Sequence, residues 1–73
     1  DVSNPIFNIG ENIFYYNRWN NEIEKGEIIH IRESKYNWDY NIRYQIYSDL
    51  TYYYWIEEKY IGRDEQVLYK YLI

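Results

Sequence analysis

The feature that most constrains the fold is a seven-residue stretch in which apolar and polar side chains alternate strictly. It covers residues 40–46 and reads Tyr-Asn-Ile-Arg-Tyr-Gln-Ile. Successive side chains of a β-strand point to opposite faces of the sheet, so this period of two predicts a strand with one buried face and one face in water. We expect Tyr40, Ile42, Tyr44 and Ile46 to share one face.

Other segments carry the β-branched and aromatic residues that favour strands. They are residues 13–16, 27–33 and 52–56, with a short extended piece over residues 61–63. The alternation within 27–33 is imperfect, which indicates a bend or a bulge. Polar residues at 17–22 and 34–39 predict an exposed loop and a turn between strands, and Lys25 and Gly26 are expected to precede the second strand.

The pattern changes from period two to a helical period at Asp64. Asp64 can cap a helix, and Glu65 favours its positive end. The apolar residues expected on one helical face are Val67, Leu68, Tyr71 and Leu72. We therefore predict a C-terminal helix over residues 64–73, an extended lead-in over residues 1–8, and a single domain that spans residues 1–73.

Four or five short strands followed by a helix fit a small barrel better than a sandwich, which needs more strands and more chain. The predicted fold class is mainly β: a small open barrel of four to five antiparallel strands with a short C-terminal helix. The chain has no cysteine, so neither a disulfide nor a thiolate metal site can assist the core.

Aromatic residues are too numerous for the core of so small a domain. Twelve tyrosines, three tryptophans and two phenylalanines occur among 73 residues. Some of these rings must therefore line a surface, a groove or an interface. Trp19 and Trp38 fall in predicted loops, where a large ring has no packing role, so we predict that they contact a partner. The composition favours a binding module over an enzyme.

The third predicted strand and the segment after it resemble the central signature of the chromodomain and Tudor-knot group of SH3-like barrels. The signature comprises the strand at 40–46, the polar turn that contains Asp49, the run Trp55-Ile56-Glu57-Glu58, and then Ile61. The resemblance implies an SH3-like domain in which Trp55 packs into the fold.

The same resemblance implies an aromatic cage for methylated lysine. In this sequence the cage would use Tyr44 and Tyr47, with Tyr15 or Tyr16 from the first strand, because ring faces attract a quaternary cation. The alternation of the third strand leaves a second interpretation open. If the face that Tyr44 shares with Ile42 is the core, Tyr44 is a structural residue.

The charge balance bears on the partner. Eight basic and twelve acidic residues give a formal net charge of −4, which opposes attraction to phosphate backbones. The basic residues do not cluster along the chain; they are Arg18, Lys25, Arg32, Lys35, Arg43, Lys59, Arg63 and Lys70. Duplex DNA is therefore not expected as a partner. A protein with a basic surface is compatible with this balance, and Asp49 is a candidate contact at an acidic rim.

Catalytic and cofactor signals are weak. His30 is the single histidine, no serine lies in a nucleophile motif, and three glycines form no phosphate-binding loop. We expect no catalytic residue, no metal and no cofactor. The apolar stretch at residues 50–56 is far shorter than the roughly 20 residues of a spanning helix, so we expect no membrane segment and a cytoplasmic location.

Two classes of binding function stay open. The first is a protein-interaction module; because the residue usage resembles that of AT-rich genomes, one form of it is a phage-encoded inhibitor of a host defence protein. The second is a small-ligand or nucleotide binder, in which aromatic rings stack on a base and Arg18, Arg32 or Arg43 meets a phosphate. An aromatic edge strand could also pair two copies, which favours a homodimer.

Overall fold

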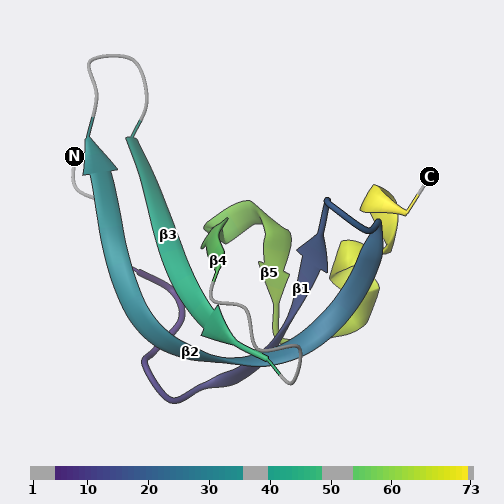
Figure 1. Cartoon of the computed structure of the whole chain (residues 1–73), viewed down its shortest axis with the longest axis horizontal. Coiled ribbons are helices and arrows are strands. Elements are labelled where there is room, and N and C mark those ends of the chain that lie inside the picture. The colour runs from purple at the N-terminus through teal and green to yellow at the C-terminus, as the bar shows by residue number, and fades with distance from the viewer. Residues whose placement is uncertain (1–4, 36–39, 49–53, 73) are drawn as a thin grey trace.

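The computed structural model describes residues 5–35, 40–48 and 54–72. In this part of the chain five antiparallel strands form one sheet that curls into a half-barrel (Figure 1). The strands are β1 (Asn12–Asn17), β2 (Glu22–Lys35), β3 (Tyr40–Tyr47), β4 (Tyr54–Glu57) and β5 (Ile61–Gly62), in the order β4-β3-β2-β1-β5. Two 3₁₀-helices follow β4 and β5, η1 (Glu58–Tyr60) and η2 (Glu65–Tyr71). The mainly β fold class, with a helix near the C-terminus, is confirmed.

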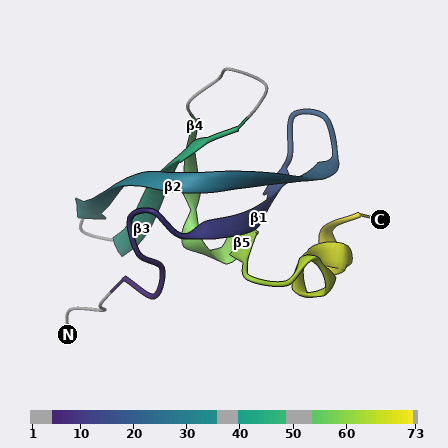
Figure 2. The same cartoon turned by 90° about the horizontal axis from the view of Figure 1, so that it is seen from below.

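The long strand β2 belongs to both halves of the sheet. Its residues 22–27 pair with β1, and its residues 27–35 pair with β3. The register with β3 shifts between Ile28 and His30, which leaves Ile29 as an extra residue. This irregularity confirms the bulge that the imperfect alternation predicted. The curved β2 thereby crosses the whole half-barrel, with β3 and β4 toward one end and β1 and β5 toward the other (Figure 2).

Gly26 lies inside β2, so the prediction that Lys25 and Gly26 precede the strand is wrong. A Cβ atom at Gly26 would come within 2.3 Å of Ile46 Cγ2 and 2.9 Å of the Tyr47 carbonyl oxygen. The backbone of β3 therefore approaches β2 too closely for any side chain here. The strand begins at Glu22, and the expected loop over residues 17–22 shrinks to a turn at residues 18–21.

The alternation in β3 decides which face is the core. Ile42, Tyr44 and Ile46 are buried, whereas Arg43 and Gln45 are half-buried on the other face. The other buried core residues are Phe7, Ile13, Tyr15, Ile28, Ile56 and Ile61. Tyr44 is therefore a structural residue, with an exposed fraction of 0%.

The hydroxyl of Tyr44 ties the N-terminal lead-in to the sheet. It donates to Glu58 Oε2 at 2.5 Å and accepts from the backbone N–H groups of Ile6 at 3.2 Å and Phe7 at 3.4 Å. Burial and then the hydrogen bond to Glu58 raise the pKa of Tyr44 to about 12. The hydroxyl thus stays protonated in the folded protein, where it satisfies polar groups that the core would otherwise leave unpaired.

Arg63 holds the same lead-in from its other side. Its Nε pairs with Glu11 Oε2, and its Nη2 donates to the Ile6 carbonyl oxygen at 2.6 Å. The guanidinium also lies 4.8 Å from the centre of the Phe7 ring. The partners of Arg63 in these contacts are Glu11, Ile6 and Phe7 of the same chain. Arg63 therefore has a structural role.

The C-terminal helix begins where the sequence predicts, but it is a 3₁₀-helix. Asp64 caps it by accepting a hydrogen bond from the N–H of Gln66 at 3.1 Å. With three residues per turn, Leu68 and Tyr71 share the inward face. Leu68 is buried, whereas Val67 and Leu72 are exposed, so the four-residue apolar face expected from an α-helical period is wrong.

Candidate binding cleft

A small cleft opens between the β1–β2 turn and the edge strand β4. Its volume is about 110 Å³. It combines aromatic rings with two arginines and is named here the aromatic–arginine cleft. Its lining residues are Tyr16, Arg18, Trp19, Arg43, Trp55, Ile56, Glu57 and Tyr60. The lining residues come from segments that are distant in the sequence: β1 and the turn after it, β3, β4 and η1.

The turn that carries Trp19 is held by a network of side chains. Asn17 is buried; its Oδ1 accepts from the Trp19 N–H at 3.0 Å, and its Nδ2 donates to Glu24 Oε1 at 3.3 Å. Glu24 also accepts from the Tyr15 hydroxyl at 2.7 Å and from Asn20 Nδ2 at 2.9 Å. Burial raises the pKa of Glu24, but these hydrogen bonds outweigh it, and the net pKa is lowered. A carboxylate thus joins the core to the turn and fixes the backbone that presents Trp19.

Three tyrosines form one wall of the cleft and the layer behind it. The ring of Tyr16 stacks on Tyr71 with centroids 5.3 Å apart, and it lies 5.8 Å from Tyr60. Tyr60 and Tyr71 meet edge to face at 5.0 Å. The Tyr71 hydroxyl donates to the Lys59 carbonyl oxygen at 3.0 Å, which fastens η2 to η1. This wall is therefore rigidly supported by elements from both ends of the chain.

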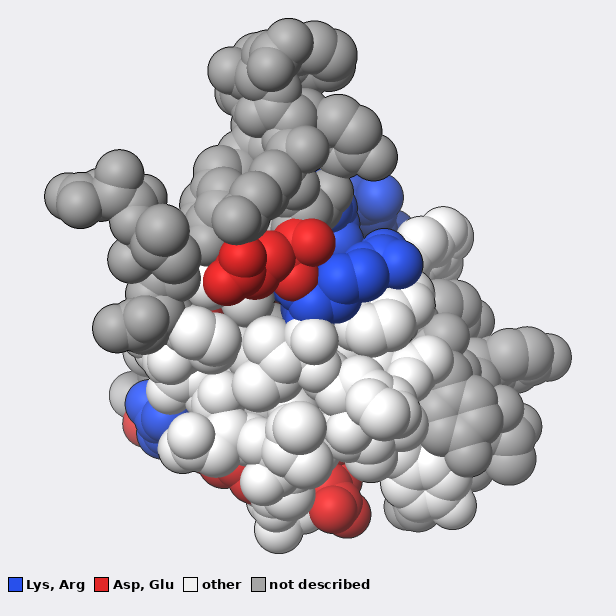
Figure 3. Space-filling view, turned by 90° about the vertical axis from the view of Figure 1, so that its left-hand side faces the viewer, with Lys and Arg blue, Asp and Glu red and all other residues white. Residues whose placement is uncertain are grey.

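Three of the four arginines of the chain gather around the cleft. Arg18 and Arg43 line it, and Arg32 stands directly opposite Arg43 in the β2–β3 register. Figure 3 shows a group of Lys and Arg side chains on the side that lies to the left in Figure 1, directly beside a group of Asp and Glu side chains and next to a broad uncharged area. Their separation along the chain gave no sign that Arg18, Arg32 and Arg43 lie near one another in the fold.

These arginines lack acidic partners within the described part of the chain. Arg32 stacks at 4.3 Å over the ring of Trp55, and Arg18 lies 5.3 Å from the centre of Trp19. Neither they nor Arg43 form an ion pair with a described carboxylate. Glu57 faces Arg43 across the β3–β4 pair, but its carboxylate pairs with Lys59 at 3.8 Å. Among the described residues, Arg18, Arg32 and Arg43 are therefore cationic groups at the cleft without an ion-pair partner.

The predicted contact residues divide among several places. Trp19 is 62% exposed at the rim of the cleft, and Tyr16 and Arg43 line it, half-buried. Tyr15 and Tyr44 are buried in the core, so neither ring has a face open to a ligand. The remaining three are Tyr47, which is 44% exposed and does not line the cleft, and Trp38 and Asp49, which lie outside the described residues.

The cage implied by the chromodomain resemblance needs rings that share one open face. Tyr44 and Tyr47 are three residues apart in β3, so their side chains point to opposite faces. The structure does not bring them together. Sequence reasoning missed Trp55 and Tyr60 as cleft residues. The strand pattern could have indicated Trp55, because it precedes the buried Ile56 and so must lie on the outer face.

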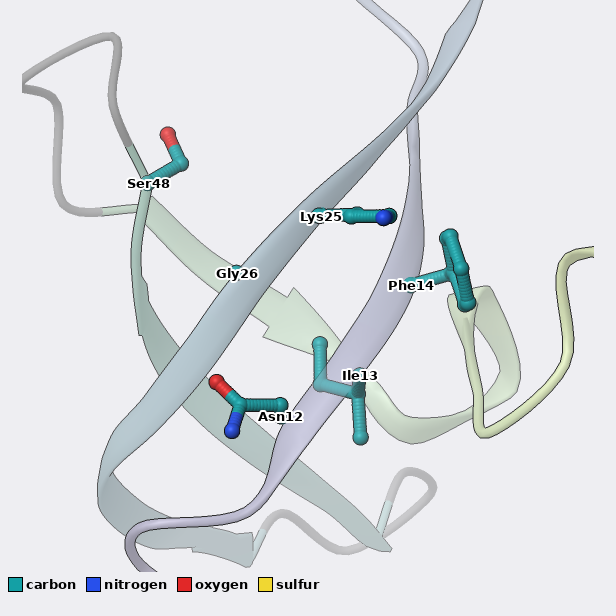
Figure 4. Close-up of a pocket in the computed structure, with 6 residues that line it drawn as sticks. All are labelled: Asn12, Ile13, Phe14, Lys25, Gly26 and Ser48. Atoms are coloured by element: carbon teal, nitrogen blue, oxygen red, sulfur yellow. The ribbon is translucent and has the colours of Figure 1, made fainter.

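A larger hollow of about 450 Å³ is less equipped for recognition. It is lined by Asn12, Ile13, Phe14, Lys25, Gly26 and Ser48 (Figure 4). Its single charged group, Lys25, extends beside Phe14, with Nζ 5.6 Å from the ring centre. No second charged group converges on the described walls, so the smaller cleft offers the richer chemistry.

The rest of the described chain adds no cofactor chemistry. Within it, no three histidine, aspartate or glutamate side chains are grouped closely enough to hold a metal ion. No helix among the described residues is long and apolar enough to cross a bilayer. Comparison with protein-family models, with curated proteins and with solved structures finds no match to this chain.

Proposed function

We propose that this domain is a non-catalytic protein-interaction module that binds its partner at the aromatic–arginine cleft. The observation that carries the proposal is the exposed ring of Trp19 on a turn held by Asn17 and Glu24. A large ring that is already ordered loses little conformational entropy when it is buried against a partner. The half-barrel also supports the finer proposal of an SH3-like domain of the chromodomain and Tudor-knot type, which rests on the signature around residues 40–61.

The size of the cleft favours a protein over a nucleotide. Pockets that enclose small ligands usually have volumes of about 300–1,000 Å³. The cleft measures about 110 Å³, which is room for one side chain of a partner. A protein can fill this space with one residue and cover Trp19 with its surroundings, whereas a nucleotide would leave most of its surface in water. A phage-encoded inhibitor of a host defence protein is one biological form of such a module, supported by its small size and residue usage.

The test is capture of a partner that depends on Trp19. Wild-type protein and Trp19→Ala would be immobilised and exposed to extracts of the source organism and, if that is a phage, of its host. Captured proteins would be identified by mass spectrometry, and the dissociation constant of each then measured. Truncation of an anchor residue should weaken binding by about 2 kcal/mol or more. The matched control is Tyr69→Ala, which removes another exposed ring that does not line the cleft.

The proposal is supported by a partner that binds wild type and Tyr69→Ala with equal affinity but binds Trp19→Ala much more weakly. If every captured protein binds Trp19→Ala as tightly as wild type, the cleft is not the interface. Circular dichroism of both variants must match that of wild type, which excludes a loss caused by unfolding.

A further inference from the structure

We infer that the aromatic–arginine cleft receives a carboxylate side chain from an acidic segment of the partner protein. This inference rests on the proposed function and specifies its chemistry. It also reverses the expectation of a basic partner, which came from the net charge of −4. Local charge at the contact decides which groups can be desolvated there, whereas the net charge acts only over longer distances and is screened by salt.

The arginine pair across β2 and β3 is the first observation. Arg32 and Arg43 are directly opposite in the register, and both lie on the outer face of the sheet. Side chains opposite one another on a sheet have Cβ atoms about 4.5–5.5 Å apart, and like charges at that distance repel. No described carboxylate forms an ion pair with either arginine; Glu57, which is opposite Arg43 on β4, pairs with Lys59 at 3.8 Å. An incoming anion would stand close to both guanidinium groups.

The placement of the arginines is the second observation. Arg18 of the β1–β2 turn and Arg43 of β3 both line this cleft of about 110 Å³, so two arginines from different segments border one space. A guanidinium presents parallel N–H donors whose spacing matches the two oxygens of a carboxylate. When a partner covers the rings of Trp19 and Trp55, these rings would keep water from the contact, which strengthens a charge-assisted hydrogen bond. Aromatic walls beside arginines thus suit an acidic residue flanked by apolar ones.

The contrast with Arg63 supports the same assignment. Arg63 already has a carboxylate, Glu11, and a backbone carbonyl oxygen as internal partners. The chain therefore satisfies an arginine where it needs one for the fold. Among the described residues, the contacts of Arg18 and Arg32 are with the rings of Trp19 and Trp55, and no ion pair joins Arg18, Arg32 or Arg43 to a described carboxylate.

The experiment uses three acetylated and amidated peptides that differ only in charge: Gly-Glu-Leu-Glu-Gly, Gly-Gln-Leu-Gln-Gly and Gly-Lys-Leu-Lys-Gly. Each is titrated into ¹⁵N-labelled full chain, and the arginine Nε–H and tryptophan Nε1–H resonances are followed by NMR. We expect the glutamate peptide alone to shift the signals of Arg18, Arg43, Trp19 and Trp55. The dissociation constant should rise with added salt.

Variants then separate charge from geometry. Arg43→Gln should raise the dissociation constant of the glutamate peptide about tenfold, because one of two desolvated donors is lost. Arg43→Lys should recover only part of this loss, since an ammonium group lacks the fork of donors. The matched control Lys25→Gln removes the same charge outside the cleft and should change binding by less than about twofold.

Several outcomes would overturn the inference. One is equal shifts with the glutamine or the lysine peptide, and another is no shift at the cleft up to about 10 mM glutamate peptide. Adenosine monophosphate shifting these signals at lower concentration would identify a nucleotide site instead. Shifts of the same signals with protein concentration alone would place a second copy of the chain in the cleft.

The inference and the proposed function can fail separately. A captured partner could require Trp19 but bind Arg18→Gln and Arg43→Gln as tightly as wild type. The proposed protein-interaction function would then hold, and the inference of a bound carboxylate would be wrong. If Trp19→Ala has no effect on any partner while the glutamate peptide still occupies the cleft, the proposed protein interface is wrong.

Discussion

The core and the aromatic–arginine cleft both contain aromatic residues, but the polar groups beside the rings differ in their hydrogen-bond and ion-pair partners. In the core, the hydroxyls of Tyr15 and Tyr44 donate to Glu24 and Glu58, so each ring is closed off from solvent by an internal acceptor. In the cleft, Trp19 and Trp55 adjoin Arg18 and Arg32, which form no ion pair with a described carboxylate. The residue type therefore does not distinguish a structural ring from a candidate contact ring. What distinguishes them is whether the polar group beside the ring has a described partner within the chain.

The two regions are nevertheless joined by one side chain. Glu24 accepts from Tyr15, which belongs to the core, and from Asn17 and Asn20, which shape the turn of Trp19. Packing in the core can thereby fix the geometry at the rim of the cleft. Substitutions on each side of this connection should then have opposite profiles, with large effects on stability in one region and large effects on binding in the other.

The largest effect should come from Ile42→Ala in the core. Ile42 is 5% exposed, and truncation of such a residue costs about 2–5 kcal/mol, which is most of the stability of a small domain. Trp55→Ala should cost less, because this ring is half-buried on the outer face. Urea denaturation followed by tyrosine fluorescence measures both. Equal losses of stability would mean that the outer face of β4 contributes as much to stability as the core. The distinction between the two regions would then be wrong.

A smaller loss is expected for Tyr44→Phe, which keeps the ring and removes the hydroxyl. The N–H of Phe7 then lacks its acceptor and Glu58 lacks a donor, at a cost of about 1–3 kcal/mol in free energy of unfolding. Tyr69→Phe is the matched control on an exposed ring and should be nearly silent. A silent Tyr44→Phe would show that the hydroxyl network does not hold the lead-in.

The same hydroxyl predicts an alkaline limit of stability. Its folded pKa of about 12 lies above the ordinary value of 10, so the folded state binds the proton more tightly than the unfolded state. This contribution is complete below pH 10 and is lost as the pH rises toward 12. Denaturation curves across that window should show wild type losing stability more steeply than Tyr44→Phe. Parallel slopes would contradict the assigned hydrogen bonds.

Glu24→Gln tests the connection between core and cleft. We expect a loss of about 1 kcal/mol in stability and weaker binding of any partner that requires Trp19, because the turn loses charged acceptor oxygens. The pKa of Glu24 is lowered from 4.5, so its contribution is present above that pH and is lost as the pH falls through the folded value. Stability between pH 5 and 2 measures this. Unchanged binding in Glu24→Gln would mean that the turn is held without the carboxylate.

The smallest effect on stability should come from Arg43→Gln at the cleft. Removal of one of two facing arginines relieves repulsion, so stability should stay the same or rise by about 0.5 kcal/mol at low salt. Thermal denaturation at low and high salt would show the gain and its screening. A loss above about 1 kcal/mol would mean that Arg43 has a structural role like that of Arg63, and the distinction between the two regions would fail.

Several elements were predictable because their causes are local. The strict alternation of β3 predicted which of its residues share a face, the imperfect alternation of β2 predicted its bulge, and Asp64 marked the start of the last helix. The helix type was predicted wrongly, because apolar spacing over so few residues does not separate three residues per turn from 3.6. Gly26 was misplaced because its small size serves a contact with Ile46, which is distant in the sequence.

The candidate site was predictable only in part. The exposure of Trp19 followed from its place in a polar turn, but the chain spacing of Arg18, Arg32 and Arg43 predicted no basic cluster. The partner, the resemblance to chromodomains and the pairing of two copies stay predictions that these observations do not test.

The sequence by itself thus determined the alternation, the turns and the excess of rings, since each depends on neighbouring residues. Only the tertiary structure decided that Tyr44 is core and that arginines from three segments meet around Trp55. The physical reason is that strand period assigns a side chain to a face, whereas register and curvature decide which residues of other strands share that face with it. A binding site assembled across strands is a property of the register, and no local pattern encodes it.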